Sequence, residues 1–487
     1  MGDLKNIETR LFINNEFVQS KSEERYTVYN PATGKHVADI PVANVADVDA
    51  AVAAASAAYK GPWSKFSAEQ RAACLNKLAD LLDAKKSEIG QLETACMGTP
   101  AAIATHMLPP MGTKLLRYYA GWADKVAGES FPPDGEGDEL YKIVQYEPLG
   151  VCAAIAAWNA TPLYLGTKMA PAVATGNTVV FKASEKSPLG INVAASCVAE
   201  AGFPPGVINF VSGGGSTGAL LAGHMGIAKI SFTGSGITGR KVQEAAARSN
   251  MKRVTLELGG KSPAVVFADA NIPNATEAAV DRFLMLTSQV CVAPSRLFVH
   301  SSIAEKFIAT AKERFEQIGK SWGASSDPTS MTTMHGPLAD QTQLKRVLDY
   351  IESGKQDAKL ITGGERIGNE GCFVQPTIFL DPKPDAKIYR EEIFGPVLTI
   401  RTFETEDEAM ELANATTYGL AAYVFTSDMG RALRVARKLE AGTVNINSGG
   451  GIDVRVPMGG IKASGSGREY GKLGLMAYLE PKTITMK

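Results

Sequence analysis

A cysteine and a glutamate in the middle of the sequence have the types and the spacing of a nucleophile and its base. Glu257 lies in VTLELGGKSP (254–263), where apolar and polar residues alternate as they do in a strand. Cys291 lies 34 residues later in TSQVCVAPSR (287–296), on a predicted short connection before the strand RLFVH (296–300). A helical pattern over roughly residues 273–286 allows the chain to return. A thiol that faces a carboxylate base can attack an electrophilic carbon.

The elements that must position this pair follow an alternation of strands and helices. From residue 150, buried apolar runs such as VCAAIAAW (151–158), TVVFK (178–182) and KISFT (229–233) alternate with helical segments. A second block of this kind covers about residues 261–462. Such alternation predicts βαβ units, with parallel sheets that carry helices on both faces.

The first part of the chain predicts short strands within residues 10–40 and helices over 47–59, 67–96 and 111–126. A turn-rich segment, SFPPDGEGDE (130–139), then precedes the alternating LYKIVQYEP (140–148). This pattern predicts an exposed strand, which is either a surface hairpin or an edge that needs a partner surface.

Composition excludes several classes of protein. With 487 residues we expect two or three domains, and a formal net charge of −1 argues against capture of nucleic acid or of an acidic membrane. The six cysteines form no CxxC pair and the five histidines are scattered, so we expect neither disulfides nor a metal site. We see no secretory signal and no apolar run of membrane-spanning length, so we expect a cytoplasmic protein.

A glycine motif leaves the role of Glu257 open. GSGITG (234–239) fits the dinucleotide fingerprint G-x-G-x-x-G, and Glu257 follows Gly234 by 23 residues, where a ribose-binding acid is expected. Glu185 competes for that role, because it follows a predicted strand with Lys182 close by. If Glu185 binds the ribose, Glu257 is free to be a base. Spacing alone does not decide between them.

Each candidate also has a purely structural interpretation. A cysteine between two valines is more often a small buried apolar residue. Glu257 in a strand can be a paired structural carboxylate, and Asn159 can simply cap the helix that follows it.

Seven motifs occur together and in a fixed order: AWNATPL, ATGNTVVFKASE, FTGS, ELGGKSP, SQVCVAPSR, EEIFGPVL and MGGIKASGSGREYG. With them the chain, from FINNEF to AYLEPKT, resembles the aldehyde dehydrogenase superfamily. The resemblance implies an α/β fold with a Rossmann-like NAD-binding domain (1–124 and 148–256), an α/β catalytic domain (257–461) and a small β oligomerisation flap (125–147 and 470–487). It also implies a homodimer or homotetramer.

The resemblance assigns roles to individual residues. Cys291 matches the nucleophile, Glu257 the general base and Asn159 an oxyanion-hole amide. Cofactor-binding positions match Ile155, Ala156, Trp158, Lys182, Ser184, Glu185, Gly215, Phe232, Gly234, Ser235, Leu258, Gly259, Glu392 and Phe394. Substrate-lining positions match Tyr164, Thr167, Val290 and Val292. The family therefore favours Glu185 as the ribose ligand, and Gly236 is not expected to be essential.

The expected activity is NAD-dependent oxidation of an aldehyde to the carboxylic acid through a Cys291 thiohemiacetal and thioester. Glu185 favours NAD, because a carboxylate repels a 2′-phosphate, and NADP is an alternative cofactor. The tunnel positions favour an aliphatic or aromatic aldehyde, whereas Arg455 keeps a semialdehyde open. The loop NSGGGIDVRVP (447–457) is expected to close the tunnel mouth.

The sequence departs from the family pattern around the nucleophile. Ser288 stands where the family commonly has Gly, Pro294 replaces another Gly, and Ala160 and Thr161 follow Asn159 in place of Phe and Pro. These departures change the shape of the pocket and remove no catalytic group. Three alternative functions are a thiol hydrolase, a non-catalytic binding protein and a CoA-acylating enzyme. A thiol hydrolase is disfavoured because no histidine is predicted near Cys291. The retained Cys, Glu and Asn disfavour a non-catalytic protein, and the presence of the Glu257 base disfavours a CoA-acylating enzyme.

Overall fold

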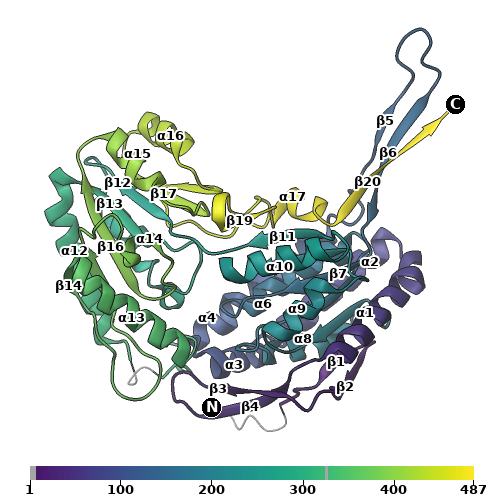
Figure 1. Ribbon diagram of the computed structural model, residues 1–487, viewed down its shortest axis with the longest axis horizontal. Coiled ribbons are helices and arrows are strands. Elements are labelled where there is room, and N and C mark those ends of the chain that lie inside the picture. The colour runs from purple at the N-terminus through teal and green to yellow at the C-terminus, as the bar shows by residue number, and fades with distance from the viewer. Residues whose placement is uncertain (1–6, 324–326) are drawn as a thin grey trace.

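The computed structural model describes residues 7–323 and 327–487, and its chain forms two lobes and a projecting arm (Figure 1). Each lobe is built on one large sheet, and Glu257 ends the strand that leads from the first sheet toward the second. The C-terminal strand runs out along the arm (Figure 1). The expected α/β class with parallel strands is confirmed.

The first sheet has a parallel centre with every strand residue buried in four of its strands. This explains the continuous apolar runs of the sequence, because parallel strands are covered on both faces. The hairpin β1–β2 and the short β19 add antiparallel edges. In spatial order the strands are β19 (Gly465–Ser466), β11 (Arg253–Glu257), β10 (Lys229–Thr233), β7 (Val151–Ile155), β8 (Thr178–Lys182), β9 (Ile208–Val211), β1 (Leu11–Ile13) and β2 (Glu16–Val18).

The second sheet is parallel apart from one edge strand, β14. Its order is β14 (Lys359–Thr362), β15 (Thr377–Leu380), β16 (Val397–Phe403), β13 (Arg296–His300), β12 (Pro263–Val266), β17 (Ala421–Phe425) and β18 (Thr443–Ile446). Strands β11 and β12 are consecutive in the chain but lie in different sheets, so the ELGG segment between them crosses from one lobe to the other.

Helices of the first lobe begin where the sequence supplies caps. Asn44 and Asp47 form a capping box at α1, and Ser67 and Gln70 form another at α2. The helices are α1 (Val45–Lys60), α2 (Ala68–Ala84), α3 (Lys86–Met97), α4 (Ala101–His106), α5 (Leu108–Ala120), α6 (Thr161–Tyr164), α7 (Ala170–Ala174), α8 (Leu189–Val198), α9 (Gly215–Gly223), α10 (Gly236–Arg248) and, near the C-terminus, α17 (Gly471–Met476).

The single helix expected over 67–96 is wrong, because the chain breaks at Lys85. Helix α2 packs mainly on α5, and α3 packs mainly on α4 and α8. The side chain of Lys85 donates to Ser196 in the segment that α3 covers. The expected helix over 111–126 also begins earlier and ends at Ala120.

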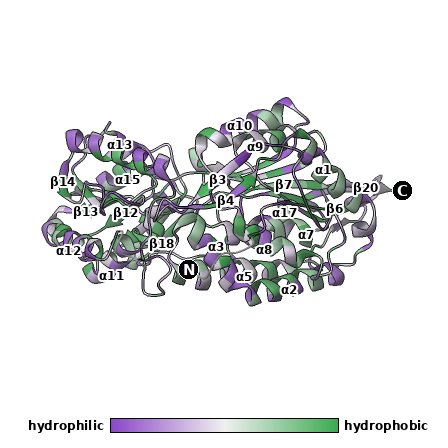
Figure 2. Cartoon of the chain, turned by 90° about the horizontal axis from the view of Figure 1, so that it is seen from below, coloured by the Kyte–Doolittle hydropathy of each residue, from purple (hydrophilic) through white to green (hydrophobic). Residues whose placement is uncertain are grey.

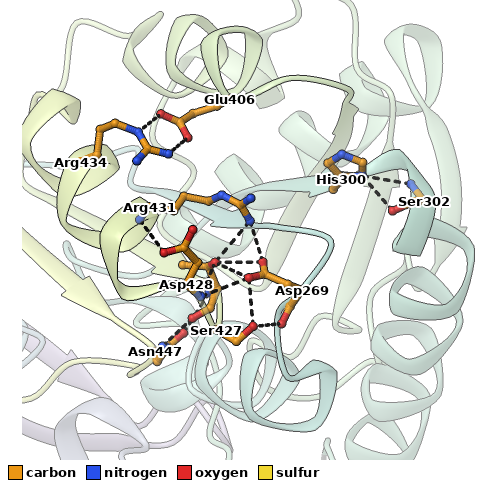
Figure 3. A network of polar contacts seen from close by, with 10 residues as sticks. Asp269, His300, Ser302, Glu406, Ser427, Asp428, Arg431, Arg434 and Asn447 are labelled. Carbon is orange, nitrogen blue, oxygen red and sulfur yellow. Dashed lines mark hydrogen bonds and ion pairs between the residues drawn. The ribbon is translucent and has the colours of Figure 1, made fainter.

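Helices of the second lobe cover both faces of its sheet. Figure 2 shows hydrophobic strands at the centre of the lobes and mixed colouring on outer helices such as α13. Asp269 joins this layer to the loop after β17: it accepts hydrogen bonds from Thr426 and Ser427 and pairs with Arg431 at 2.8 Å (Figure 3). The helices are α11 (Ile272–Thr276), α12 (Ser301–Lys320), α13 (Gln341–Asp357), α14 (Lys387–Arg390), α15 (Glu406–Asn414) and α16 (Met429–Lys438).

Two small sheets complete the fold. Strands β3 (Arg25–Tyr29) and β4 (His36–Pro41) form a hairpin. The arm consists of β5 (Glu129–Phe131), β6 (Tyr141–Pro148) and β20 (Leu479–Met486), with β6 in the middle. The expected exposed strand at 140–148 therefore pairs on both edges, one of them with the C-terminal strand. Among the described helices, none is long and apolar enough to cross a membrane.

Candidate active site

Glu257 and Cys291 meet where the chain passes between the lobes. Glu257 ends β11, and Cys291 lies in the turn that leads into β13. A Cβ atom added at Gly260 would lie 2.4 Å from the carbonyl oxygen of Cys291, so only glycine allows the ELGG segment to pack against the thiol loop. The predicted return of the chain to its starting strand is therefore present.

A cavity of about 120 Å³ opens at the thiol and extends to the start of α10. It brings together ten of the residues that the sequence assigned to catalysis, cofactor or substrate. These are Trp158, Asn159, Tyr164, Gly234, Ser235, Leu258, Gly259, Cys291, Glu392 and Phe394. Four further lining residues were not predicted: Ala157, Thr233, Gln343 and Arg346. The remaining assigned residues lie outside its lining.

The thiol loop begins with a left-handed turn. Leu286, Thr287 and Ser288 have φ values of 51°, 60° and 57°, a region that costs a non-glycine residue about 1–2 kcal/mol. The hydroxyl of Thr287 donates to the carbonyl of Gly336, and that of Ser288 donates to the carbonyl of Phe283. These bonds help to hold the turn.

The helix expected over roughly 273–286 is therefore only partly correct. The chain is helical over Ile272–Thr276, continues as a π-helical turn over Glu277–Asp281, and then leaves the helix. The left-handed turn reverses the chain and delivers the thiol to the cavity, which a continued helix would not do.

The surroundings of Cys291 keep it a thiol in the free protein. Removal of solvent, followed by the charges of Glu392 and Glu257, raises the pKa of Cys291 to about 12. Both carboxylates are thus close enough to act on the sulfur electrostatically. Ionisation of the thiol must accordingly be coupled to the binding of substrate or to proton transfer to a nearby base.

Glu257 is buried, with 5% of its surface exposed, and neither carboxylate oxygen has a hydrogen-bond partner within the described part of the chain. Its Oε1 lies against the backbone of Gly459, where an added Cβ would be 2.6 Å away. Burial, and then the charge of Glu469, raises the pKa of Glu257 well above its usual value. A carboxylate in this state is a stronger base than an exposed one.

Three charged groups that act on Glu257 were not predicted: Glu469, Lys168 and Arg468. Lys168 and Glu469 form a buried ion pair of 2.6 Å, and Ser231 contacts both at 3.0 and 3.2 Å. The positive charge of Lys168 acts on Glu257 in the opposite direction to Glu469. Lys168 lies in a π-helical turn, Leu165–Met169, where the altered helical repeat redirects side chains. The only feature of the sequence that pointed to Lys168 was the presence of a lysine within an otherwise apolar helical segment.

Asn159 does not cap the helix that follows it. The cap position of α6 belongs to Ala160, and no side chain bonds there. The Asn159 Nδ2 instead donates to the carbonyl oxygen of Gln289 at 2.9 Å, two residues before the thiol. The amide is therefore fixed beside the Cys291 thiol loop.

Glu392, which was expected on the nicotinamide side together with Phe394, contacts the ELGG glycines. Glu392 Oε1 accepts from the backbone N–H of Gly260 at 2.9 Å, and a Cβ at Gly259 would lie 2.2 Å from Oε2. Burial raises the pKa of Glu392 to about 7. Phe394 has a left-handed φ of 61° and meets Trp158 edge to face at 5.3 Å.

Helix α13 holds this segment through the two residues that the sequence did not single out. Gln343 donates to the carbonyl of Phe394 at 2.8 Å, and Arg346 donates to the carbonyl of Glu392 at 2.8 Å. The i, i+3 spacing of these two residues on a predicted helix could be seen in the sequence, but the loop that they contact could not be predicted.

At the other end, Lys182 and Glu185 lie 3.9 Å apart at the carboxyl end of β8. Burial lowers the pKa of Lys182, and Glu185 opposes that effect. The remaining cofactor candidates surround the same strand ends: Ile155 ends β7, Ala156 donates its N–H to the Lys182 carbonyl, Ser184 follows β8, Gly215 begins α9, and Phe232 lies in β10. Such strand ends are where α/β sheets bind nucleotides.

Gly236 has open space around it, since an added Cβ would meet nothing within 4 Å. Glu257 faces Gly459 and Glu469 rather than the start of α10, and it is outside the lining of the cavity. Both observations agree with the interpretation in which the fingerprint match is accidental.

The substrate candidates have mixed surroundings. Thr167 is buried and its hydroxyl donates to the Leu163 carbonyl, whereas Val290 and Val292 flank the thiol half-buried. Arg455 points into solvent and makes three hydrogen bonds to the Asp453 carboxylate. Its charge is therefore already paired, which disfavours it as a reader of a substrate carboxylate.

Comparisons with known proteins agree with this geometry. The aldehyde dehydrogenase family model matches residues 17–484. Retinal dehydrogenase 2 of Homo sapiens is 44% identical over 483 residues, which is 98% of this chain and 92% of that protein. Cytosolic aldehyde dehydrogenase 1 of Rattus norvegicus is 43% identical over 491 residues, 100% and 96% of the two chains. The NAD+ complex of a Bacillus cereus aldehyde dehydrogenase has a TM-score of 0.95 at 39% identity, covering 99% and 96%.

Proposed function

Because the chain belongs to the aldehyde dehydrogenase family, and is an NAD-dependent oxidoreductase acting on aldehydes, we propose that it works through a covalent bond between substrate and Cys291. The convergence of Cys291, Glu257 and Asn159 from three distant segments carries this proposal. Each supplies one group that the chemistry needs: a nucleophile, a base and a hydrogen-bond donor.

The protein offers a fitting place for the cofactor. Lys182 and Glu185 form a donor–acceptor pair suited to ribose hydroxyls, and the first turn of α10 beside Gly234 and Ser235 suits a pyrophosphate. The cavity joins that helix start to the thiol. When bound, NAD accepts a hydride from the substrate carbon.

The first chemical step belongs to Cys291. Its thiol releases its proton to solvent as Sγ attacks the aldehyde carbon, which forms a thiohemiacetal and places negative charge on the former carbonyl oxygen. The Nδ2 of Asn159 and the backbone N–H of Cys291 donate to that oxygen. Loss of one such donor costs about 2.7–4 kcal/mol. Oxidation of the thiohemiacetal leaves a thioester on the same sulfur.

The second step belongs to Glu257. Its buried carboxylate accepts a proton from water, and the resulting hydroxide attacks the thioester, releasing the acid and the Cys291 thiol. The raised pKa of Glu257 strengthens it as a base once it is ionised. Lys168 and Glu469 set how readily it ionises.

The half-buried Val290 and Val292 and the pairing of Arg455 with Asp453 favour an uncharged aliphatic or aromatic aldehyde over a semialdehyde. Glu185 favours NAD over NADP. We propose the domain boundaries that the resemblance implies: 1–124 with 148–256, 257–461, and 125–147 with 470–487.

We also infer a homodimer or homotetramer. The arm carries exposed apolar side chains, Phe131, Tyr141 and Met486, on strands that project from the lobes (Figure 1). A cytosolic relative supports a cytoplasmic location.

The test is a panel of aldehydes with NAD or NADP, followed by absorbance of the reduced nicotinamide. We expect turnover with uncharged aldehydes and a preference for NAD. Cys291→Ala should abolish turnover and leave NAD binding intact. Activity that survives in Cys291→Ala would disprove the covalent mechanism, and thioester hydrolysis without reduction of NAD would favour the thiol-hydrolase alternative.

A further inference from the structure

A tyrosine hydroxyl contacts the amide that we place in the oxyanion hole. Tyr164, the last residue of α6, is 7% exposed, and its hydroxyl lies 3.0 Å from Oδ1 of Asn159. The other end of the amide, Nδ2, lies 2.9 Å from the carbonyl oxygen of Gln289. The Asn159 amide is therefore held at both ends by residues that the mechanism above does not use.

These two contacts determine which way the amide faces. A backbone carbonyl only accepts hydrogen bonds, so the group that faces Gln289 must be Nδ2. Oδ1 then faces Tyr164, whose hydroxyl must donate. Burial raises the pKa of Tyr164 well above its usual value, so this hydroxyl keeps its proton in neutral and mildly alkaline solution.

The support behind this amide is itself fixed. The Gln289 side chain accepts from the backbone N–H of Ala339 at 2.9 Å and donates to the carbonyls of Leu286 and Pro337 at 3.3 Å. On the other side, the ammonium of Lys168 lies 5.7 Å from the centre of the Tyr164 ring. Both partners of Asn159 thus have little freedom to move.

We propose that Tyr164 is a positioning residue that locks and polarises the Asn159 amide for oxyanion stabilisation. This inference rests on the proposed function, because it presupposes an oxyanion at Cys291. One Nδ2 proton is occupied by Gln289, and the second is free to donate to the substrate oxygen. Donation from Tyr164 to Oδ1 prevents a flip of the amide. It also draws electrons toward Oδ1, which makes Nδ2–H a stronger donor.

Tyr164 was expected to line the substrate site, and its contact with Asn159 gives its hydroxyl a different role. Its hydroxyl is already used by Asn159, so the substrate meets at most the ring. A positioning role predicts the same loss for every aldehyde when the hydroxyl is removed, because all aldehydes form the same oxyanion. A substrate-binding role predicts a loss that changes with the aldehyde.

The decisive measurement is a double-mutant cycle with Tyr164→Phe and Asn159→Ala. Pre-steady-state formation of reduced nicotinamide is followed with a short and a bulky aldehyde, and rates are expressed per active thiol from the burst amplitude. We expect Tyr164→Phe to slow the first turnover roughly 10-fold, less than the roughly 100- to 1000-fold of a lost oxyanion donor. The KM for NAD should not change, and the loss should be equal for both aldehydes.

In the Asn159→Ala background, removal of the Tyr164 hydroxyl should have no further effect, because the amide that it positions is gone. The matched control is Tyr119→Phe, which removes another buried hydroxyl, bonded to the Gly471 carbonyl, outside the lining of the cavity. It should leave the first-turnover rate unchanged in both backgrounds. Thermal denaturation of all variants separates loss of fold from loss of rate.

Equal slowing by Tyr164→Phe with and without Asn159, or an unchanged rate, would overturn the positioning role. Losses that differ between the aldehydes would assign Tyr164 to the substrate instead. If Cys291→Ala stays active, the proposed function itself fails. If Cys291→Ala is inactive and Asn159→Ala is slow, only the Tyr164 inference is at stake.

Discussion

Replacement of Glu257 by Gln should raise the stability of the protein and strongly slow its turnover. Both carboxylate oxygens of Glu257 are buried and unpartnered within the described chain, and its pKa is raised by burial. The folded state therefore binds the proton more tightly than the unfolded state. Above the unfolded pKa, near 4.5, stability should fall as pH rises, by about 1.4 kcal/mol per pH unit until the folded pKa is reached. Gln carries no charge and removes this loss.

The kinetic effect has a different size and origin. A general base contributes about 100- to 10,000-fold, which is about 3–5 kcal/mol of activation free energy. Glu257→Gln should keep the first turnover, because Cys291 and Asn159 are intact, and lose the hydrolysis step. Stopped-flow absorbance should show a burst of up to one reduced nicotinamide per thiol, followed by slow turnover. In the wild type, hydrolysis should rise with pH through the raised pKa.

Glu93→Gln is the matched control. Glu93 is 1% exposed and burial raises its pKa to about 8, but its partner is Ser187 and it does not line the cavity. It should share the gain in melting temperature at high pH and keep full turnover. The reasoning is refuted if Glu257→Gln shows no burst and only a higher KM for NAD, which is the behaviour of a ribose ligand. A melting temperature of Glu257→Gln that does not exceed the wild type at pH 8 would contradict the burial argument.

Three further changes test other parts of the site. Gly260→Ala should reduce the rate of the first turnover by at least roughly 100-fold, because its Cβ would clash with the carbonyl oxygen of Cys291. Gly236→Ala lies in open space and should leave kcat and the KM for NAD unchanged. Similar losses in both variants would contradict this reasoning. Glu469→Gln removes a charge that raises the pKa of Glu257, so the acid side of the pH–rate profile should move to lower pH, and a shift to higher pH would reverse the sign that we assign. Glu185→Gln should reduce the preference for NAD over NADP by roughly 10-fold, as expected for the loss of one charge near a surface. The preference is measured as the ratio of the two kcat/KM values. An unchanged ratio would show that Glu185 does not bind the ribose.

Local patterns predicted most of the framework. Apolar runs such as residues 178–182 and 229–233 are strands of the parallel sheet, and Ser67 begins a helix as its cap predicts. These features depend on residues close in sequence, through burial on both faces of a strand or a bond to the first turn of a helix. The break at Lys85 was missed, because no glycine or proline marks it in the sequence.

The sequence suggested that Cys291 could act as a nucleophile, but it did not predict how the chain brings the thiol to the cavity. The spacing of Glu257 and Cys291 and the motifs around them were sufficient to suggest a thiol and its base. Nothing in LTSQV signals that three non-glycine residues adopt a left-handed turn, because that turn is held by carbonyls of Gly336 and Phe283. The sequence left open a contact between Arg455 and a substrate carboxylate, and in the structure Arg455 pairs with its neighbour Asp453.

Residue types and local periodicity were enough to predict the fold class and the family, and they identified the residues that we propose to carry the reaction. The environment of those residues depends on contacts that form only in the folded chain. Lys168 meets Glu469 across 301 positions, and Asn159 meets Gln289 across 130. Such contacts form only when segments that are distant in the sequence pack together. The basicity of Glu257 and the orientation of the Asn159 amide come from burial and from these distant partners, and neither quantity exists in the unfolded chain.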